Sequence, residues 1–382
     1  MHLAIDASNI RQGGGITHLS QLLSAADPVE AGINHVTVWA CSATLAQLPS
    51  KTWLTTLSPT WIEAGLLQRM LGQQFLLPKE LSRRGCDVLF SPGGTVPFHT
   101  KVPVVTMSQN MLPFEPKEAM QFGRWSRMRL KMWLLRSSQR RSFNQANGLI
   151  FLTQYAREGV SRWLGKPKGL QTLIPHGIEA RFEACPKLQR SVSDYSFEQP
   201  FTFLYVSILM PYKHQLEVAQ AASELRRNGY PIKVRFVGAD WESYGERFRV
   251  TLRLLDPQEE FLIWPGNVAF TALHDEYHSA DAFIFASSCE NLPNILIEAM
   301  AAGLPIASSS AGPMPEVLGN AGVYFDPSQS QDIARAMREL MNNVELRRRI
   351  TIEAKELSRV YSWHRCAKDT FDFIAAVTTQ RP

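Results

Sequence analysis

Short apolar runs alternate with helical stretches along the whole chain, and this alternation constrains the fold more than any other feature. The runs are continuous and rich in β-branched and aromatic residues, which is typical of parallel strands that helices cover on both faces. The sequence therefore predicts the α/β class with doubly wound sheets. The predicted strands are HLAID, HVTVWA, DVLFSP, VPVVTMS, GLIFLT, FTFLYVS, KVRFVG, EFLIWPG, AFIFAS, LPIASS and GVYF.

The chain has 382 residues, which is more than one hydrophobic core usually serves, so two domains are expected. The stretch EACPKLQRSVSDYSFEQP, residues 183–200, is polar and aperiodic and contains two prolines, as linkers often do. We predict an amino-terminal domain over 1–185, a linker over 186–200 and a second domain over 201–360. Sheets of this class bind ligands at the carboxyl ends of their strands, which predicts a site in a cleft between the two halves.

Composition narrows the class of protein. Hydrophobic residues make up 45% and charged residues 20%, which excludes disordered and collagen-like chains. The five cysteines are scattered without a C-x-x-C pair or a histidine cluster, so we expect no metal site and a reduced, cytoplasmic protein. The first residues read as a strand rather than a secretory signal, and no apolar window is long enough to span a bilayer. A net charge of +5 is only weak support for a nucleic-acid partner.

Two glutamates, Glu290 and Glu298, frame the start of a predicted helix. DAFIFASS reads as a buried strand and NILIEAMAAG as a helix, which places Glu290 on the loop between them and Glu298 about two turns into the helix. Their separation of about 12 Å at the helical rise suits the sugar and the ribose of a sugar nucleotide. Unpaired N–H groups from about Leu292 to Ile295, with Pro293 in the first turn, favour a bound diphosphate. The alternative is that both glutamates are solvated helix charges.

The segment FASSCENLPNILIEAMAAGLPIASSSAGPMPEV resembles the donor-binding segment of the retaining glycosyltransferases of family 4, also called glycosyl transferases group 1. In that family a serine-rich strand end, E-x7-E, EAMA-x-G-x-P and G-x-x-P-E recur in this order. YVSILMPYKHQ, FVGAD, WPGNV, IPHGIE and YSWHRCAKDT resemble other family segments, and the likeness covers roughly the last two hundred residues. It implies the GT-B fold, with two Rossmann-like domains facing each other across a cleft and a last helix, 361–382, that returns to the amino-terminal domain.

The resemblance also assigns roles to individual residues. Glu290 corresponds to the family's donor-sugar carboxylate, Glu298 to its ribose carboxylate and Lys213 to its phosphate-binding lysine. Glycosyl transfer needs such a cation because negative charge builds on the departing diphosphate. A lysine after Pro-Tyr is otherwise a solvated turn residue. The remaining donor-side residues implied are Gly14, Gly15, Ser207, Gly238, Asn267, Asn291, Leu292, Pro293 and Asn294.

The chain departs from the family pattern at one cation. Ile208 stands where the family usually has an arginine, so one of the two expected diphosphate cations is missing. Donor binding then depends on Lys213, the helix amides and another cation such as Arg11. The sequence has no Asp-x-Asp, with which a metal-dependent transferase would hold Mg²⁺ or Mn²⁺. We therefore expect a metal-independent enzyme without a cofactor.

A run of three glycines, residues 13–15, lies between the first predicted strand and the first predicted helix. Glycines allow the backbone to approach a phosphate or a sugar closely. The run is not the dinucleotide fingerprint, because G-x-G-x-x-G fails after Gly15. A plain tight turn is the alternative. By resemblance, this loop contacts the donor phosphates or the acceptor.

Gln109 and Asn110 follow a predicted strand at a place where the family often carries a His-Asp pair near the reacting carbon. Both side chains can hydrogen-bond a sugar hydroxyl, but neither is a general base near neutral pH. In the front-face mechanism proposed for this fold, the departing phosphate takes the acceptor's proton and the protein mainly positions the reactants. We assign Asn110 to the reacting centre and Gln109 and His176 to the acceptor side. His176 is equally compatible with a purely structural role.

Residues 122–146 form a basic stretch without an acidic residue. Tryptophan, methionine and leucine residues are interleaved with its cations, which is typical of helices that bind membrane surfaces. A core helix with a basic polar face is the alternative, and a nucleic-acid contact is the more remote one. The cations are Arg124, Arg127, Arg129, Lys131, Arg136, Arg140 and Arg141, and the tryptophans are Trp125 and Trp133.

These observations favour a retaining glycosyltransferase that moves a hexose, with mannose or rhamnose as a guess, from a nucleotide diphosphate sugar to a glycan hydroxyl. We expect a role in surface polysaccharide or lipopolysaccharide O-antigen synthesis, a glycan or lipid-linked glycan acceptor, and peripheral contact with the inner face of the cytoplasmic membrane. One alternative is a GT-B sugar-nucleotide epimerase. Another is a glycan-binding or assembly protein that keeps the fold without catalysis.

Overall fold

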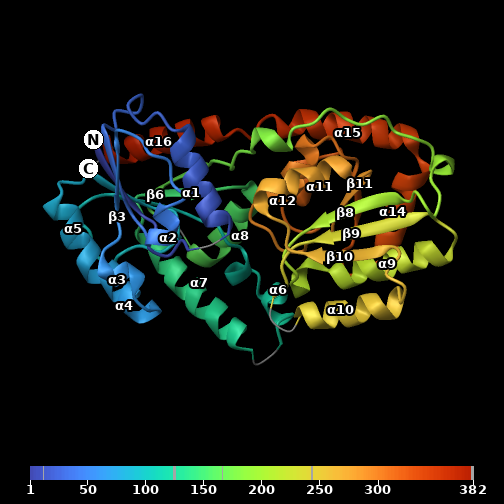
Figure 1. The fold of residues 1–382 in the computed structure, drawn as a ribbon. Coiled ribbons are helices and arrows are strands. Elements are labelled where there is room, and N and C mark those ends of the chain that lie inside the picture. Colours follow the sequence, from blue (N-terminus) through green and yellow to red (C-terminus); the bar gives the residue numbers. More distant parts are fainter. Residues whose placement is uncertain (12, 124–125, 166, 242–243, 380–382) are drawn as a thin grey trace. The chain divides into compact units, whose positions relative to one another are not determined.

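The computed structural model describes the chain except residues 12, 124–125, 166, 242–243 and 380–382 (Figure 1). The chain divides into two compact units. The first contains Met1–Ala119, Trp125–Gly177 and Tyr361–Pro382, and the second contains Met120–Arg124 and Ile178–Val360. Each unit is built around its own parallel sheet.

The sheet of the first unit has seven strands in the order β3-β2-β1-β4-β5-β6-β7. All its strands are parallel, and residues of β1 such as Leu3 and Ile5 are fully buried. The sequence prediction missed the two edge strands, β3 and β7. The strands are β1 (His2–Asp6), β2 (His35–Trp39), β3 (Leu54–Leu57), β4 (Val88–Ser91), β5 (Val104–Met107), β6 (Gly148–Phe151) and β7 (Leu170–Leu173).

The sheet of the second unit has six parallel strands in the order β10-β9-β8-β11-β12-β13. Its first strand, β8, therefore lies in the middle, and the order reverses between β8 and β11. The predicted α/β class with doubly wound sheets is confirmed. The strands are β8 (Phe201–Val206), β9 (Ile232–Val237), β10 (Leu262–Gly266), β11 (Ala282–Phe285), β12 (Ile306–Ser309) and β13 (Val323–Phe325).

Helices connect the strands and cover the sheets, as parallel pairing requires. In the first unit α16 packs on α1 and also contacts β4 and β6. The helices of this unit and of its boundary are α1 (Gly14–Ala25), α2 (Ser42–Leu45), α3 (Thr60–Glu63), α4 (Leu66–Leu71), the π-helix η1 (Gly72–Leu76), α5 (Leu77–Arg83), η2 (Leu112–Phe114), α6 (Pro116–Met120), α7 (Arg127–Gln145), α8 (Gln154–Leu164) and α16 (Trp363–Thr379).

In the second unit, Figure 1 shows α11, α12 and α15 on one side of the sheet and α9 and α10 on the other. The helices are η3 (Ala180–Phe182), η4 (Val192–Asp194), η5 (Pro211–Lys213), α9 (Gln215–Arg227), α10 (Tyr244–Leu255), η6 (Phe270–Ala272), α11 (Leu273–Ser279), α12 (Asn294–Ala301), α13 (Met314–Leu318), α14 (Ser330–Asn342) and α15 (Val344–Ser358).

The polar segment 186–200, indicated as a linker by its composition, lies in the second unit. The buried Arg347 of α15 holds it by donating to Gln189 Oε1 at 2.9 Å and to the carbonyl oxygen of Arg190. Lys355 donates to the carbonyl oxygen of Ala184 just before it. Side chains of α15, which is distant in the sequence, hold this segment in place, so it needs no periodic pattern of its own.

Candidate donor site

The strands β8 and β11 are neighbours at the point where the strand order of the second sheet reverses. Open α/β sheets bind ligands at the carboxyl ends of their strands at such a reversal. Lys213 lies in the turn η5 after β8, and Glu290 lies on the loop after β11. The topology therefore brings together two residues that are 77 positions apart in the sequence.

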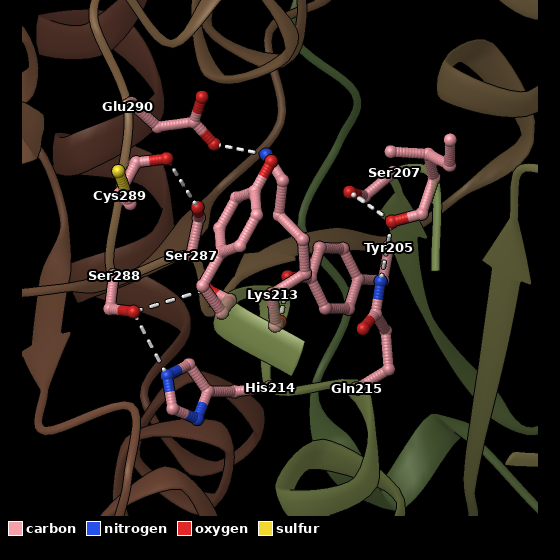
Figure 2. A network of polar contacts seen from close by, with 11 residues as sticks. Tyr205, Ser207, Lys213, His214, Gln215, Ser287, Ser288, Cys289 and Glu290 are labelled. Carbon is pink, nitrogen blue, oxygen red and sulfur yellow. Dashed lines mark hydrogen bonds and ion pairs between the residues drawn. The ribbon is translucent and has the colours of Figure 1, made fainter. Parts of the chain in front are cut away.

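Lys213 and Glu290 form an ion pair between Nζ and Oε1, and Figure 2 shows the carboxylate pointing at the ammonium group. Only 7% of the Lys213 side chain and 16% of the Glu290 side chain is exposed. Water and salt screen such a pair less than they screen a surface pair, so the two charges interact strongly. The sequence assigned each residue a role but gave no indication of their direct contact.

Aromatic side chains fix the position of Lys213. The hydroxyl of the buried Tyr205 donates to the backbone carbonyl oxygen of Lys213. The ammonium nitrogen lies 5.3 Å from the ring centroid of Tyr212 and 5.6 Å from that of Phe285. Aromatic ring faces attract cations, so these rings stabilise the charge that burial disfavours.

A polar network joins the turn that carries Lys213 to the loop that carries Glu290 (Figure 2). Ser288 donates its N–H to the carbonyl oxygen of Tyr212 at 2.9 Å and its hydroxyl to the same oxygen at 3.2 Å. The ring of His214 reaches Ser288 Oγ with Nε2 at 3.1 Å, and its backbone has a φ of 51°. Positive φ is uncommon outside glycine, so the contacts of His214 hold the start of α9 in a strained turn.

Glu298 lies on α12 and accepts a hydrogen bond at Oε2 from the hydroxyl of Tyr277, at 2.7 Å. Burial raises the pKa of Glu298 to about 7, although the Tyr277 hydrogen bond and the charge of Arg181 oppose this rise. Tyr277 is fully buried on α11, and its hydroxyl also lies 3.3 Å from the carbonyl oxygen of Ile295. No sequence motif marked Tyr277 or Arg181 as part of this site.

The start of α12 differs from the sequence prediction in two respects. The helix begins at Asn294, so Glu298 is its fifth residue and lies little more than one turn inside it. The N–H group of Asn294, predicted to be unpaired, donates to the carbonyl oxygen of Leu292 at 2.9 Å. Pro293 is the N-cap, and its ring restricts the backbone so that a short turn precedes the helix. Asn291 and Leu292 are buried in this turn.

Ser207 and Gly238 follow neighbouring strands and lie against each other. A Cβ atom on Gly238 would lie 2.0 Å from the carbonyl oxygen of Ser207, and the φ of Gly238 is 151°. Only glycine permits this approach. The N–H of Gly238 donates to the carbonyl oxygen of Gly266 at 2.9 Å, which joins the ends of β9 and β10. The predicted donor residue Asn267 comes next and is exposed.

Ile208, which stands where the family usually has an arginine, and Arg11, the substitute cation considered, lie in different units. Ile208 is exposed, and its carbonyl oxygen accepts a hydrogen bond from Gln215 Nε2 at 3.0 Å. Arg11, considered as a substitute cation, belongs to the first unit and donates to the carbonyl oxygen of Ile62.

In the first unit, Gly14 and Gly15 form the first turn of α1, and Gly13 is the N-cap with a φ of 68°. A Cβ atom on Gly15 would lie 3.7 Å from Gln109 Oε1. Gln109 in turn lies 3.2 Å, through Nε2, from Nδ1 of the buried His18. The structure therefore places Gln109 beside both Gly15 and His18, and His18 is a residue that the sequence did not single out.

The rings of His18 and His176 stack with centroids 4.5 Å apart, and His176 stacks on Trp363 at 5.6 Å. Burial lowers the pKa of His18 well below its usual range, and the proximity of His176 adds to this effect. Asn110, by contrast, is exposed and uses Oδ1 to accept the N–H of Leu112 at 3.0 Å.

The basic stretch 122–146 contains α7, which Ser126 caps by accepting the N–H of Arg129 at 3.3 Å. Arg136 lies over the ring of Trp163 at 4.1 Å, and Arg141 lies over the ring of Phe98 at 3.7 Å. Two of the residues predicted to contribute, Arg124 and Trp125, lie outside the described residues.

Two further observations concern the described part of the chain. No group of three or more histidine, cysteine, aspartate or glutamate side chains is arranged there to hold a metal ion. None of the helices described has the length and apolar character needed to cross a membrane.

Solved structures of other proteins have the same fold. The structure of HepE from Anabaena in complex with UDP and glucose is similar, with a TM-score of 0.70 over 97% of both chains at 16% sequence identity. Two parallel Rossmann-like sheets with such a neighbour define a protein of the GT-B class. Residues 190–357 match the family described as glycosyl transferases group 1, and the second unit of the chain therefore belongs to this family.

Two curated relatives match shorter segments. Sulfoquinovosyl transferase SQD2 of Arabidopsis thaliana is 30% identical over 106 residues, which are 26% of this chain and 21% of that protein. O-antigen chain mannosyltransferase B of Escherichia coli is 26% identical over 115 residues, which are 30% of each protein. The match thus spans less than a third of either relative.

Proposed function

We propose that this protein is a retaining glycosyltransferase that moves a hexosyl group from a nucleotide diphosphate sugar to a hydroxyl group of a glycan. The hexose is mannose or rhamnose, and the product is a surface polysaccharide such as the O antigen of lipopolysaccharide. The family of the second unit supports sugar transfer. The Escherichia coli relative, which is named an O-antigen chain mannosyltransferase, supports the choice of sugar and product.

The observation that carries the proposal is the ion pair of Lys213 and Glu290 at the reversal of the second sheet. In a sugar nucleotide the anomeric carbon is bonded to a phosphate oxygen, so groups that bind the sugar and the phosphate must lie side by side. Lys213 provides a cation for the departing diphosphate, and Glu290 accepts hydrogen bonds from the hexose hydroxyls. Direct contact between their side chains satisfies this requirement.

Glu298 binds the ribose of the donor. Its carboxylate accepts hydrogen bonds from the two ribose hydroxyls, and the Tyr277 hydroxyl holds the carboxylate in place. The backbone near Ser207, Gly238 and Asn267 faces the nucleoside, and the turn of Asn291, Leu292, Pro293 and Asn294 faces the sugar and the diphosphate.

The proposed reaction breaks the bond between the anomeric carbon and the phosphate oxygen and forms a bond from the same face to the acceptor oxygen. The acceptor's proton moves to the departing phosphate oxygen, so no side chain has to act as a general base. Lys213 stabilises the charge that develops on the phosphate, which is why we propose no metal requirement. The chemistry depends mainly on positioning.

The first unit supplies the acceptor side. Gln109 and His176 contact the acceptor glycan, Asn110 lies near the reacting carbon, and the N–H groups at Gly14 and Gly15 approach the phosphates. The acceptor is a glycan or a lipid-linked glycan at the inner face of the cytoplasmic membrane, with contact through residues 122–146. Nucleic acid is not a partner in this proposal.

Calorimetric titration with a panel of nucleotide sugars and free nucleotides, in the presence of EDTA, tests the donor site. We expect micromolar binding of one nucleotide family, lost in Lys213→Ala and in Glu298→Ala and kept in Lys233→Ala, a lysine of β9. Absence of binding by the wild type would refute the proposal. Product analysis then separates the alternatives, because an epimerase changes the sugar without an acceptor and a non-catalytic protein binds the donor without turnover.

A further inference from the structure

The segment of α4 and η1, residues 66–76, carries the largest group of exposed apolar side chains that lie close together in the described first unit. Leu66, Leu67 and Phe75 are 63%, 70% and 61% exposed. Water-exposed side chains of this size in one short segment indicate a binding surface, because isolated exposed leucines are normal but a contiguous group is not. The group consists of Leu66, Leu67, Met70, Leu71, Phe75 and Leu76.

The backbone of this segment keeps the apolar side chains outward. Gly72 packs against Trp61 so closely that a Cβ atom would lie 2.3 Å from its ring. The next residue, Gln73, turns inward and donates from Nε2 to Oδ2 of the buried Asp6 at 2.5 Å. The inward polar residue anchors the π-helix, so Phe75 and Leu76 remain at the surface. An apolar groove of about 530 Å³ lies between α3 and this segment, lined by Trp61, Leu71 and Phe75 among others.

Contacts connect this segment to the basic helix α7. Gln74 Oε1 accepts the N–H of Phe98 at 2.7 Å, and the guanidinium group of Arg141 on α7 lies 3.7 Å from the centroid of the Phe98 ring. Phe98 is itself half exposed. Figure 1 shows α4 and α7 at the same lower edge of the first unit. These contacts join the apolar segment, through Phe98, to the end of α7 that carries Arg141.

The exposed side of α7 combines cations and apolar groups. Arg127, Leu130, Lys131 and Leu134 recur at helical spacing and are exposed, and Trp133 lies beside them. The sequence contains no aspartate or glutamate between Glu118 and Glu158, and none from residue 64 to residue 79. The surface therefore offers apolar side chains and positive charge together, which matches the interface of an anionic bilayer.

We propose that α4, η1, Phe98 and the exposed side of α7 form a docking surface for an anionic lipid bilayer. The apolar side chains of residues 66–76 enter the boundary between head groups and acyl chains. The cations of α7 face the lipid phosphates, and Trp133 lies at the head-group level. This surface extends the contact proposed for residues 122–146 to a second segment and does not depend on which sugar is transferred.

Vesicle flotation tests the proposal with the full chain and without donor or acceptor, so its result is independent of sugar transfer. Vesicles of phosphatidylcholine with about 30% phosphatidylglycerol are compared with phosphatidylcholine alone at about 0.1 M salt. We expect the wild type to bind the anionic vesicles at least ~10-fold more strongly than the neutral ones. A wild type that does not float with anionic vesicles overturns the proposal.

Two variants and their controls separate the apolar and the charged parts. Leu66→Ser, Leu67→Ser and Phe75→Ser together are expected to weaken binding at least ~10-fold. The control Val250→Ser, Leu254→Ser and Ile352→Ser changes exposed apolar residues of the second unit and is expected to bind like the wild type. Arg127→Gln with Lys131→Gln is expected to weaken binding about fivefold per cation, and Arg338→Gln with Arg349→Gln serves as its control.

Thermal unfolding of each variant checks that these surface changes leave the fold intact. Binding of the apolar variant at wild-type strength overturns the proposal. Equal loss of binding in the variant and its control also does so. If the wild type does not bind vesicles but forms a dimer in gel filtration that the apolar variant abolishes, the surface is a protein interface and the proposal is wrong.

Discussion

The two sheets of this protein reverse their strand order at corresponding places, yet the two reversal points hold different chemistry. In the first sheet, β1 lies next to β4, and the buried Asp6 at the end of β1 accepts hydrogen bonds from Gln73 Nε2 at 2.5 Å and from the N–H of Ser8 at 3.1 Å. In the second sheet, β8 lies next to β11, and Lys213 pairs with Glu290.

The comparison separates the contribution of topology from that of the side chains. Topology places polar residues at both reversal points, because parallel strands end at the same edge. At the first point the carboxamide of Gln73 donates a hydrogen bond to the carboxylate of Asp6, and burial raises the pKa of Asp6. At the second point both partners are charged. A phosphate can replace Glu290 as the partner of Lys213, and a sugar hydroxyl can replace Lys213 as the partner of Glu290. Only the second point therefore has the chemistry that the proposed donor site requires.

The largest expected effect follows from removing the cation of the second reversal point. Lys213→Met is expected to lower kcat at least ~100-fold, because one charge that stabilises the transition state is lost. It also leaves Glu290 without its partner, which is expected to lower the free energy of unfolding by about 2 kcal/mol. The double variant Lys213→Met with Glu290→Gln should regain stability without regaining activity. Wild-type turnover in the double variant would remove the distinction between the two reversal points.

The next effect concerns the pH dependence of stability through Glu298. Its pKa of about 7 in the folded protein exceeds the ordinary value of 4.5, so the folded state holds the proton more tightly than the unfolded state. The contribution of Glu298 to the free energy of unfolding is therefore fully present below pH 4.5 and is lost as pH rises through 7, a change of about 3 kcal/mol. Urea unfolding of the wild type and of Glu298→Gln at pH 5 and pH 8 measures this term. Parallel pH profiles for the two proteins would contradict it.

A smaller effect is expected at the first reversal point. Gln73→Leu leaves Oδ2 of the buried Asp6 without its carboxamide donor, which is expected to destabilise the protein by about 2 kcal/mol. Donor affinity, measured by calorimetry, should be unchanged, because Gln73 is not part of the donor site. Gln68→Leu, at an exposed position of α4, is the control. Loss of donor binding in Gln73→Leu would show that both reversal points serve the ligand.

The smallest effect on stability is expected at Gly14 of the first unit, and Gly238 of the second unit provides the contrast. Gly14 has open space around its Cα and lies in the first turn of α1, so Gly14→Ala is expected to change stability by less than ~1 kcal/mol, in the stabilising direction. Gly238→Ala should instead destabilise strongly, because the Cβ atom would meet the carbonyl oxygen of Ser207. Thermal unfolding measures both. A marked loss of stability in Gly14→Ala would mean that its turn is more constrained than the helix start indicates.

The sequence predicted the central strands of both sheets because buried parallel strands are continuous apolar runs. It missed β3 and β7, whose side chains are mostly half-buried or exposed, since these two edge strands lack that pattern. The π-helix η1 was also beyond reach, because it depends on the packing of Gly72 against Trp61 rather than on a local motif. The local pattern thus predicted every strand of the second sheet, its edge strands β10 and β13 included, and failed only at the two edges of the first sheet.

The site was predicted as a set of separate residues. Lys213, Glu290 and Glu298 were identified through motifs and through resemblance to the family, but the ion pair depends on two strands becoming neighbours in the sheet. Tyr277 and Arg181 were missed because their effect on Glu298 arises from tertiary packing, and neither belongs to a motif. The segment NILIEAMAAG was predicted to be helical and α12 begins at its first residue, Asn294, but Glu298 lies little more than one turn inside the helix and the N–H of Asn294 is paired within the preceding turn.

Under the proposed function, the ion pair at the second reversal point makes donor binding an exchange of partners. Lys213 already interacts with a carboxylate of its own chain, so an incoming diphosphate competes with Glu290 for the ammonium group. A free nucleotide can take over Lys213 but offers no hydroxyl groups of a hexose to the displaced carboxylate. The complete sugar nucleotide provides a new partner for both charges at once. Under the proposed function, the chain thus contains an internal competitor that discriminates against the product nucleotide and favours its release after each transfer.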